Sequence, residues 1–305
     1  MTKEQQSYDA HSKWYEKRFP DKDLQNETIR RWLDDKRSGN INYWIHKRMF
    51  GLADPLCSDL SKTWLTVGDG YGIDANYFFE KGLDVTASDI SGTFLPLARE
   101  HNLLEKYMIE NVEKLSFDDN CFDYVFCKES YHHFPRPYMA VYEMLRVARH
   151  GVVLIEPQDP ISKIPLLLAF RNMMDRIDTS LLRRVWKNQY SFEEVGNYVF
   201  KLSVREMEKL SNGIGMPAMA VKGINNNFYT PEVHNQKADN SSAVFRKIQR
   251  KRLLLDLLSD LSIIPRQVLG IIIFKTMPGA VLRERLIEDG YKLYCFPDNP
   301  YTGLP

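Results

Sequence analysis

The stretch Thr66-Val67-Gly68-Asp69-Gly70-Tyr71-Gly72 is the part of the sequence that decides the fold. It ends a short β-rich run, Thr63–Val67, and leads into a helical pattern over residues 73–81. Glycine permits positive φ and close backbone approach, so such a turn can hold a ligand against the N-terminus of the following helix. The spacing is G-x-G-x-G, whereas the dinucleotide fingerprint would need glycine where Ile73 stands. By itself the turn fits either a ligand site or a plain tight turn.

Strand-like and helical stretches alternate beyond this turn. Apolar β-rich runs lie at 83–87, 124–127 and 151–156, with a weaker one at 107–110, and helical patterns lie at 93–101 and 139–148. Such alternation predicts βαβ units and a parallel sheet. Two later runs, 217–224 and 268–275, are candidates for further strands, and 279–289 is a candidate helix before a proline-rich extended tail. Two capping boxes predict helix starts, at Ser191 with Glu194 and at Ser203 with Glu206.

Polar motifs follow the ends of these predicted strands. Asp89 ends the second one, where a carboxylate can accept both hydroxyls of a ribose or simply cap the next helix. A third motif covers residues 110–117, before a strand at 122–126. A fourth follows that strand and reads Tyr131-His132-His133-Phe134-Pro135-Arg136-Pro137. Ligands of open α/β sheets bind at the carboxyl edge, so we expect these motifs to lie near one another.

Taken together, these motifs resemble the class I S-adenosylmethionine-dependent methyltransferases, in particular the small-molecule branch related to the ubiquinone and menaquinone methyltransferases. The resemblance covers about residues 62–157 and, more faintly, 203–275. It implies an α/β fold with a Rossmann-like, seven-stranded, mostly parallel sheet and helices on both faces. On that analogy 268–275 is the antiparallel strand and 217–224 the strand before it.

The domain organisation follows from the extent of the resemblance. We expect an N-terminal helical cap over residues 1–60, because aromatic and apolar residues recur there at helical spacings. The methyltransferase domain would cover 61–277, with helical inserts at about 158–202 and 225–266, and 278–305 would be a C-terminal extension. The cap and inserts would enclose a small acceptor.

The resemblance also implies a site for S-adenosylmethionine, with S-adenosylhomocysteine as product. The three glycines would line its methionine and ribose part, and Asp89 would bind the ribose hydroxyls. Asn111 stands where the family usually has Asp, and its side-chain oxygen can still accept a hydrogen bond from the adenine amino group. The residues assigned to the cofactor are Gly68, Asp69, Gly70, Gly72, Asp89, Ile90, Asn111, Val112 and Lys128.

The sequence departs from the family pattern at two further places. Thr66 replaces the usual acid of the first strand, which leaves Asp69 as the candidate for a negative charge near the sulfonium. His150-Gly151 replaces the usual Gly-Gly before the fifth strand. The backbone of Val112 would face the adenine ring, and Lys128 would lie near the methionine moiety.

His132 and His133 are the candidate catalytic residues. Methyl transfer is an in-line displacement that depends largely on positioning and desolvation. A hydroxyl acceptor must also lose a proton, and the near-neutral pKa of histidine suits that task. The alternative interpretation is that the pair packs the turn before Pro135, and Glu129 and Tyr131 are further candidates for the base in the same loop.

The predicted function is therefore transfer of a methyl group from S-adenosylmethionine to a small-molecule acceptor at a hydroxyl oxygen. N-methylation of a small amine is one alternative. A non-catalytic cofactor-binding or assembly protein is another, and the departures at Thr66 and Asn111 keep it open. The acceptor and the oligomeric state are not determined by the sequence.

Composition restricts partners and location. Lys and Arg number 41 against 40 Asp and Glu, so a global attraction to nucleic acid or to anionic membranes is not expected. The apolar runs are too short to span a bilayer, and the polar N-terminus is unlike a secretory signal, which predicts a cytoplasmic protein. The four cysteines form no CxxC pair, and no metal site is expected. Glu156 and Asp159 could contact a cation or shape a loop.

Two segments remain open to a structural or a functional interpretation. A predicted helix at about 244–261 has a buried stripe of Ile248, Leu255, Leu258 and Leu261. Its basic run is either a solvated face or a contact with an anionic substrate, and it consists of Arg246, Lys247, Arg250, Lys251 and Arg252. The insert after residue 160 is either an apolar cover over the substrate or ordinary core, and its marker residues are Met173, Met174, Trp186 and Tyr190.

Overall fold

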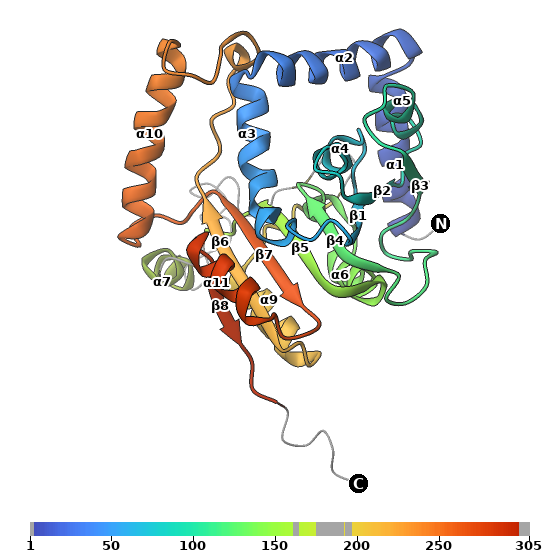
Figure 1. Cartoon of the computed structure of the whole chain (residues 1–305). Coiled ribbons are helices and arrows are strands. Elements are labelled where there is room, and N and C mark those ends of the chain that lie inside the picture. Colours follow the sequence, from blue (N-terminus) through green and yellow to red (C-terminus); the bar gives the residue numbers. More distant parts are fainter. Residues whose placement is uncertain (1–2, 161–164, 175–191, 193–196, 299–305) are drawn as a thin grey trace.

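A single eight-stranded sheet organises the molecule, in the order β3-β2-β1-β4-β5-β7-β6-β8 (Figure 1). The computed structural model describes residues 3–160, 165–174, 192 and 197–298. The strands are β1 (Thr63–Val67), β2 (Asp84–Asp89), β3 (Lys106–Ile109), β4 (Phe122–Lys128), β5 (Ala148–Pro157), β6 (Ala218–Ile224), β7 (Val268–Phe274) and β8 (Lys292–Cys295). The α/β, mostly parallel sheet expected from the sequence is confirmed.

Strand direction changes at β7. Strands β1 to β5 pair in parallel, whereas β7 is antiparallel to both of its neighbours, β5 and β6. The expectation of seven strands was wrong by one, because β8 pairs with β6 within the tail that we expected to be an extended segment. The reason is that the outer edge of β6 carries unpaired backbone groups, and a short extended segment returning beside it satisfies them.

Helices cover both faces of the sheet. Helices α4 (Ile73–Phe79), α5 (Leu95–Glu100) and α6 (Pro137–Val147) are the connections between parallel strands, and η2 (Tyr131–His133) precedes α6. The later helices are α7 (Pro165–Met174), α9 (Val204–Gly213), α10 (Ala243–Asp260) and α11 (Ala280–Glu288). No described helix has both the length and the apolar composition needed to cross a membrane.

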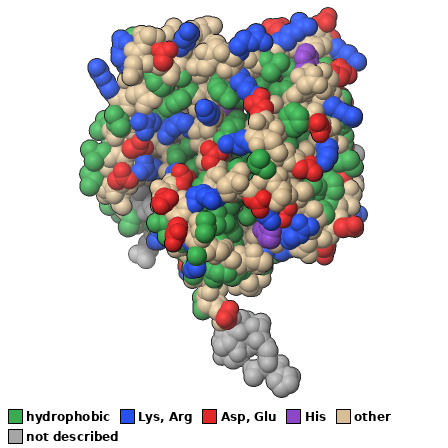
Figure 2. All heavy atoms as spheres, in the orientation of Figure 1, with side chains coloured by type: hydrophobic (Ala, Val, Ile, Leu, Met, Phe, Trp, Pro, Cys, Tyr) green, Lys and Arg blue, Asp and Glu red, His purple; other side chains and the backbone are tan. Residues whose placement is uncertain are grey.

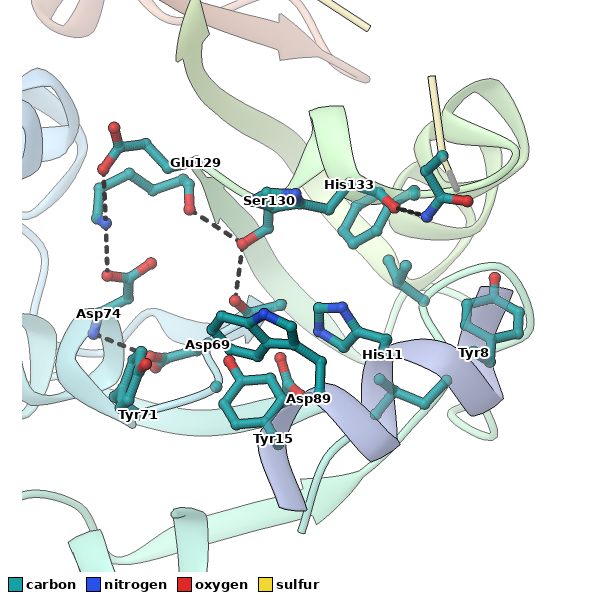
Figure 3. A pocket seen from close by; sticks show the side chains of 18 of the residues that line it. Tyr8, His11, Tyr15, Asp69, Tyr71, Asp74, Asp89, Glu129, Ser130 and His133 are labelled. Atoms are coloured by element: carbon teal, nitrogen blue, oxygen red, sulfur yellow. Dashed lines mark hydrogen bonds and ion pairs between the residues drawn. The ribbon is translucent and has the colours of Figure 1, made fainter. Parts of the chain in front are cut away.

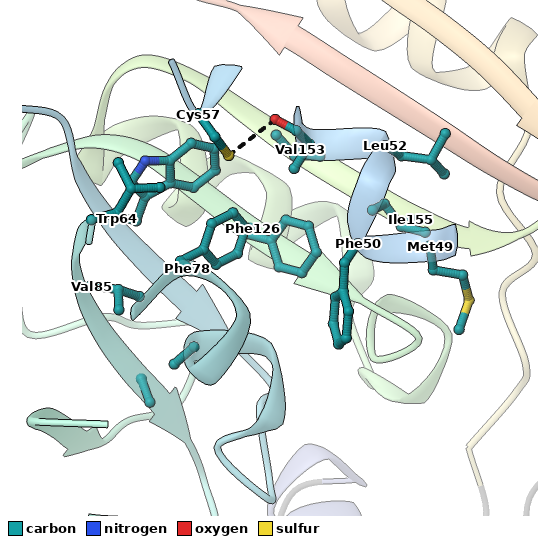
Figure 4. Packing of buried hydrophobic residues seen from close by; sticks show 14 of the residues in the cluster. Met49, Phe50, Leu52, Cys57, Trp64, Phe78, Val85, Phe126, Val153 and Ile155 are labelled. Atoms are coloured by element: carbon teal, nitrogen blue, oxygen red, sulfur yellow. Dashed lines mark hydrogen bonds between the residues drawn. The ribbon is translucent and has the colours of Figure 1, made fainter. Parts of the chain in front are cut away.

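The core lies in two clusters, one on each face, because successive side chains of a strand point to opposite sides. On β4, Tyr124 and Phe126 belong to one cluster, and Val125 and Cys127 belong to the other. In the first cluster the rings of Trp64 and the α4 residue Phe78 stack at 4.4 Å, beside Phe126 (Figure 4). Strands buried on both faces explain why these segments read as continuous apolar runs.

Three helices precede the sheet: α1 (Lys3–Arg18), α2 (Lys22–Ser38) and α3 (Ile41–Phe50), followed by the short η1 (Gly51–Leu56). The side chain of Asp21 caps α2 by accepting from the Leu24 amide at 2.8 Å, and Asn40 caps α3 in the same way. Helix α1 packs against the glycine turn through aromatic rings, with the ring centroids of Tyr15 and Tyr71 6.1 Å apart. The N-terminal helices therefore border the edge of the sheet where a ligand would bind.

The connection between β6 and β7 carries η3 (Pro231–Asn235) and α10. Helix α10 packs on α3 through Phe245, whose ring lies 5.2 Å from that of Trp44. The predicted buried stripe of α10 was partly wrong: Ile248 is buried, but Leu261 is 62% exposed. Phe245, which was not predicted, fills the contact with α3 near the start of α10, and Leu261 lies beyond the end of the helix.

The insert after β5 is described only in part. Helix α7 begins at Pro165, and Met174 at its end is buried while Met173 is exposed. The predicted positions Trp186 and Tyr190 and the capping box of Ser191 and Glu194 lie outside the described residues. Helix α9 begins directly after Ser203, as its capping box predicted, with Leu202 and Met207 both buried.

Candidate active site

A cavity of about 700 Å³ opens at the carboxyl edge of the sheet. This volume lies within the range of small-molecule sites. Its wall combines the loops after β1, β2, β3 and β4 with α1, one residue of α3 and two residues of the insert (Figure 3). It includes Gly68, Asp69, Gly70, Asp89, Ile90, Asn111, Val112, Lys128 and His133. Nine of the eleven residues singled out from the sequence thus share one cavity, and Gly72 and His132 are not among its lining residues.

Gly68 and Gly72 are required by geometry, for different reasons. Both have positive φ, at 66° and 70°. A Cβ on Gly68 would lie 2.5 Å from the Cβ of Ser130, so glycine lets the loops after β1 and β4 touch. The Ser130 hydroxyl donates to the Gly68 carbonyl at 2.7 Å across this contact. A Cβ on Gly72 would meet Leu104 and Ala98 instead, so Gly72 serves packing behind the cavity wall.

Asp69 is held by the first turn of α4. Its carboxylate accepts the backbone N–H groups of Asp74 at 3.1 Å and Ala75 at 2.8 Å. It also accepts the hydroxyl of Thr66 at 3.0 Å, so the unusual threonine in β1 supports the acid of the turn. Burial raises the pKa of Asp69, and these hydrogen bonds oppose the shift. A negative charge at a helix N-terminus is favourable in itself, because it meets the positive end of the helix dipole.

Asp89 presents one carboxylate oxygen to the cavity. Oδ1 accepts the Ser91 amide at 2.7 Å, whereas Oδ2 accepts no hydrogen bond from the described residues. Burial raises the pKa of Asp89 to about 7. The Tyr15 hydroxyl from α1 occupies the place where a Cβ on Gly70 would stand, and Asp89 Oδ2 lies 3.5 Å from that same position. The Tyr15 hydroxyl and the free oxygen of Asp89 therefore both face the space beside Gly70.

Lys128 and Asp74 form a buried ion pair in the cavity wall, with Nζ 3.1 Å from Oδ1. Glu129 lies 3.8 Å from the same ammonium. Burial alone would lower the pKa of Lys128, but the two carboxylates more than offset this and raise it. Glu129 has a positive φ of 51°, a strained backbone for a non-glycine residue, which brings its side chain to the cavity (Figure 3).

Asn111 and Val112 line the cavity from the loop after β3. The Asn111 side-chain oxygen accepts the Glu113 amide at 2.9 Å. An amide oxygen has two lone pairs, so it can accept a second hydrogen bond from a ligand.

The two histidines after β4 have neighbouring rings but different surroundings. His133 lines the cavity, and the Asn197 amide donates to its carbonyl oxygen at 2.6 Å. His132 Nδ1 lies 2.6 Å from Oε2 of Glu156, which is fully buried. The other oxygen of Glu156 accepts the backbone amides of Ser130 and Tyr131, both at 2.8 Å. Glu156 therefore shapes the loop that carries both rings, whose centroids are 4.0 Å apart.

Sequence reasoning expected the N-terminal cap to enclose the acceptor but named none of the cap residues that line this wall. His46 on α3 reaches the cavity, and its Nδ1 has no hydrogen-bond partner among the described residues. Burial lowers the pKa of His46 to about 4, so the ring is neutral at physiological pH. Helix α1 contributes Ser7, Tyr8, His11, Trp14, Tyr15 and Arg18. No motif marks these residues, because their position depends on how the cap folds back onto the sheet.

The described part of the chain contains no candidate metal site. No group of three or more His, Cys, Asp or Glu side chains there could hold a metal ion. Glu156, one of the two carboxylates considered for a cation, is occupied by the hydrogen bonds to its own loop.

Comparison with known proteins agrees with this geometry. Residues 65–155, which run from β1 to β5, match the family model described as a methyltransferase domain. This matched segment, about a third of the chain, is similar to a methyltransferase domain. This domain is 30% identical over 90 residues to the malonyl-acyl carrier protein O-methyltransferase of Pectobacterium atrosepticum. That alignment covers 30% of this chain and 36% of the relative, so the two share about a third of their lengths.

The solved structures similar to this chain share little sequence identity with it. The YcgJ protein of Bacillus subtilis is 18% identical, with a TM-score of 0.47 covering 76% of this chain and 100% of that one. An S-adenosylmethionine-dependent methyltransferase of Methanosarcina mazei is 17% identical, with a TM-score of 0.42 covering 71% and 92%.

Proposed function

We propose that this protein transfers a methyl group from S-adenosylmethionine to a small-molecule acceptor at a hydroxyl oxygen. The observation that carries the proposal is the shared cavity: residues expected to hold the cofactor and a histidine suited to proton transfer line one space of about 700 Å³. The match to a methyltransferase domain supports the same activity.

The cofactor would lie across the loops after β1, β2 and β3. Asp89 Oδ2 would accept the ribose hydroxyls, and the missing side chain of Gly70 lets the Tyr15 hydroxyl approach the same place. Asn111 and Val112 would border the adenine, in line with their position in the cavity. When bound, the cofactor supplies a methyl carbon that is already electrophilic because it sits on a sulfonium.

We assign the proton transfer to His133. An acceptor hydroxyl becomes a strong nucleophile only as its proton leaves, and His133 is the histidine of the loop after β4 that reaches the cavity. His132 has a positioning role. The Glu156 carboxylate holds the His132 ring, and the contact between the His132 and His133 rings keeps the turn in place. Tyr131 is buried outside the cavity lining, which leaves Glu129 as the alternative base.

His46 would orient the acceptor rather than accept its proton. A base is most effective when its pKa lies near the working pH, and burial lowers the pKa of His46 to about 4. Its unpartnered Nδ1 can still form a hydrogen bond to a polar group in the cavity. A buried polar atom without a partner is costly, and an acceptor would remove that cost on binding.

The test combines binding and rate measurements on single variants. Calorimetry with S-adenosylmethionine and S-adenosylhomocysteine should show binding that His133→Ala leaves near wild type. In turnover with a panel of hydroxyl acceptors, His133→Ala should lower the rate by about 10²–10⁴-fold and remove the limb that rises with pH. His132→Ala should lower the rate less and keep that limb, since His132 does not reach the cavity.

The same experiment separates the alternatives. A pH limb that follows the pKa of an amine substrate and survives His133→Ala would replace O-methylation with N-methylation. Cofactor binding without turnover on any acceptor would favour a binding or assembly protein. Loss of cofactor binding in His133→Ala would place His133 in the cofactor site and overturn its assignment as the base.

A further inference from the structure

Helix α10 has an exposed face that changes in character along its length. Arg246, Lys247, Arg250 and Lys251 are exposed in its first half. The second half and the turn after it expose five large aliphatic side chains, each 56–62% exposed: Leu253, Leu254, Leu257, Leu261 and Ile263. Figure 2 shows this division at the left edge of the molecule, with Lys and Arg over the upper part of α10 and hydrophobic side chains over its lower part.

The cations of this face have no acidic partners in the described part of the chain. Arg252 pairs with Asp256, and Arg266 pairs with Asp256 and Asp260, whereas none of the four exposed cations makes an ion pair there. The first turn of α10 has no acidic residue, and Arg246 stands there instead. Cations at a helix N-terminus are unfavourable because they meet the positive end of the helix dipole. Arg246 donates to the carbonyl oxygens of Asn240 and Ser241, but no carboxylate of the described residues balances the charge of the four cations.

The exposed aliphatic side chains in the second half of α10 are also unfavourable on a surface that contacts only water. Leu254, Leu257 and Leu261 follow one another at spacings of three and four residues, so they form one stripe. Neither α3 nor the sheet buries this stripe, since α10 contacts α3 through Phe245 near its start. Contiguous apolar surface of this kind marks interaction sites.

We propose that this face of α10 docks the protein on an anionic lipid surface. Leucines that enter the acyl boundary beside cations at the headgroup level are the pattern of interfacial helices. Phosphate on a nucleic acid would fit the cations but would leave the leucines without a role. Helix α10 lies in the connection from β6 to β7, which leaves and re-enters the sheet at the carboxyl edge where the cavity lies. Docking would thus bring that edge towards the lipid.

Vesicle sedimentation of the full chain tests the proposal. Wild type should bind phosphatidylcholine vesicles that contain phosphatidylserine, bind pure phosphatidylcholine weakly, and dissociate as salt is raised. Each basic residue near an anionic surface contributes roughly fivefold to binding. Arg250→Gln with Lys251→Gln, and Leu254→Gln with Leu257→Gln, should each weaken binding by about tenfold or more.

Helix α11 supplies the matched controls, because Val281 and Ile287 are 68% and 60% exposed and Arg283 is exposed. Val281→Gln with Ile287→Gln, and Arg283→Gln, should bind vesicles as wild type does. All variants should keep S-adenosylhomocysteine affinity, which shows that they are folded and separates this proposal from the proposed activity.

Three results would overturn the proposal. The first is no binding to phosphatidylserine vesicles, or equal losses in the α11 variants. The second is salt-sensitive vesicle binding that survives the leucine substitutions, which would reduce the face to a site for polyanions. The third is a lack of vesicle binding together with a wild-type dimer in sedimentation velocity that the leucine variant no longer forms. That result would assign the stripe to a second copy of the chain.

Discussion

Asp89→Asn should make the protein more stable and bind the cofactor less well. Burial raises the pKa of Asp89 to about 7, against about 3.9 for an unperturbed Asp. Between these values the folded protein holds a proton that the unfolded chain has lost, so stability falls as pH rises from about 4 to 7. Above pH 7 the ionised carboxylate costs the fold roughly 4 kcal/mol at most. Asparagine has the same shape and no charge, so it removes this cost.

The cofactor reverses the sign of the effect. Ribose hydroxyls would donate to Asp89 Oδ2, and hydrogen bonds to a charged group contribute about 1.5–3 kcal/mol each. Affinity for S-adenosylhomocysteine in the wild type should therefore rise with pH up to about 7, as Asp89 ionises. Asp89→Asn should bind about tenfold more weakly at pH 8 and show no such rise.

Thermal melts of the free protein at pH 5 and pH 8, beside calorimetry at both, measure the two effects. A change of 1 kcal/mol moves Tm by about 2–4 °C in domains of 150–250 residues, so Asp89→Asn should melt several degrees higher at pH 8 and gain less at pH 5. Asp84→Asn is the control, since Asp84 lies on the same strand and makes an exposed ion pair with Lys106. Equal or lower Tm for Asp89→Asn at pH 8, or unchanged affinity, would refute the reasoning.

Two further variants test other parts of the cavity wall. Burial lowers the pKa of His46 to about 4, so the free protein should lose stability as pH falls from about 6.5 to 4. In denaturant melts at pH 7 and 4.5, His46→Gln should lose less stability between the two pH values than wild type does. Equal losses in the two proteins would contradict the prediction. Gly68→Ala should destabilise the protein more than Gly82→Ala does. Both glycines have positive φ, but an added Cβ has an atom within 4 Å only at Gly68. Of the two variants, only Gly68→Ala should lose cofactor affinity. Equal Tm losses, or normal affinity, would show that the loop after β4 yields to the extra methyl group.

The sheet was predictable because buried parallel strands leave continuous apolar runs in the sequence. The run Thr63–Val67 was predicted with the bounds that the structure has, and 217–224 differs from β6 by one residue. Strand β8 was not predictable in this way: it has four residues and forms because β6 offers it an edge. Pairing of that kind depends on tertiary position, which the local sequence pattern does not predict.

The same distinction holds for the cavity. Asp89 and Gly70 follow strand ends, and topology alone brings such residues to one edge. His132 and His133 are adjacent and alike in the sequence, and the structure distinguishes them: the buried Glu156 on β5 holds His132, whereas His133 lines the cavity. His46 and Tyr15 reach the wall from the N-terminal helices, and a helical pattern predicts an amphipathic face without saying what it will cover.

The antiparallel position of β7 has a consequence for how the chain is made. β6 is synthesised before β7 but lies beyond it in the sheet, so β6 has no paired neighbour until Val268–Phe274 has emerged. At about 5–20 residues per second, translation of the connection between them takes several seconds. During that interval the ribosome-bound chain holds an apolar segment, Ala218–Ile224, with both edges open. Chaperone dependence during synthesis should accordingly concentrate in the window between these two strands.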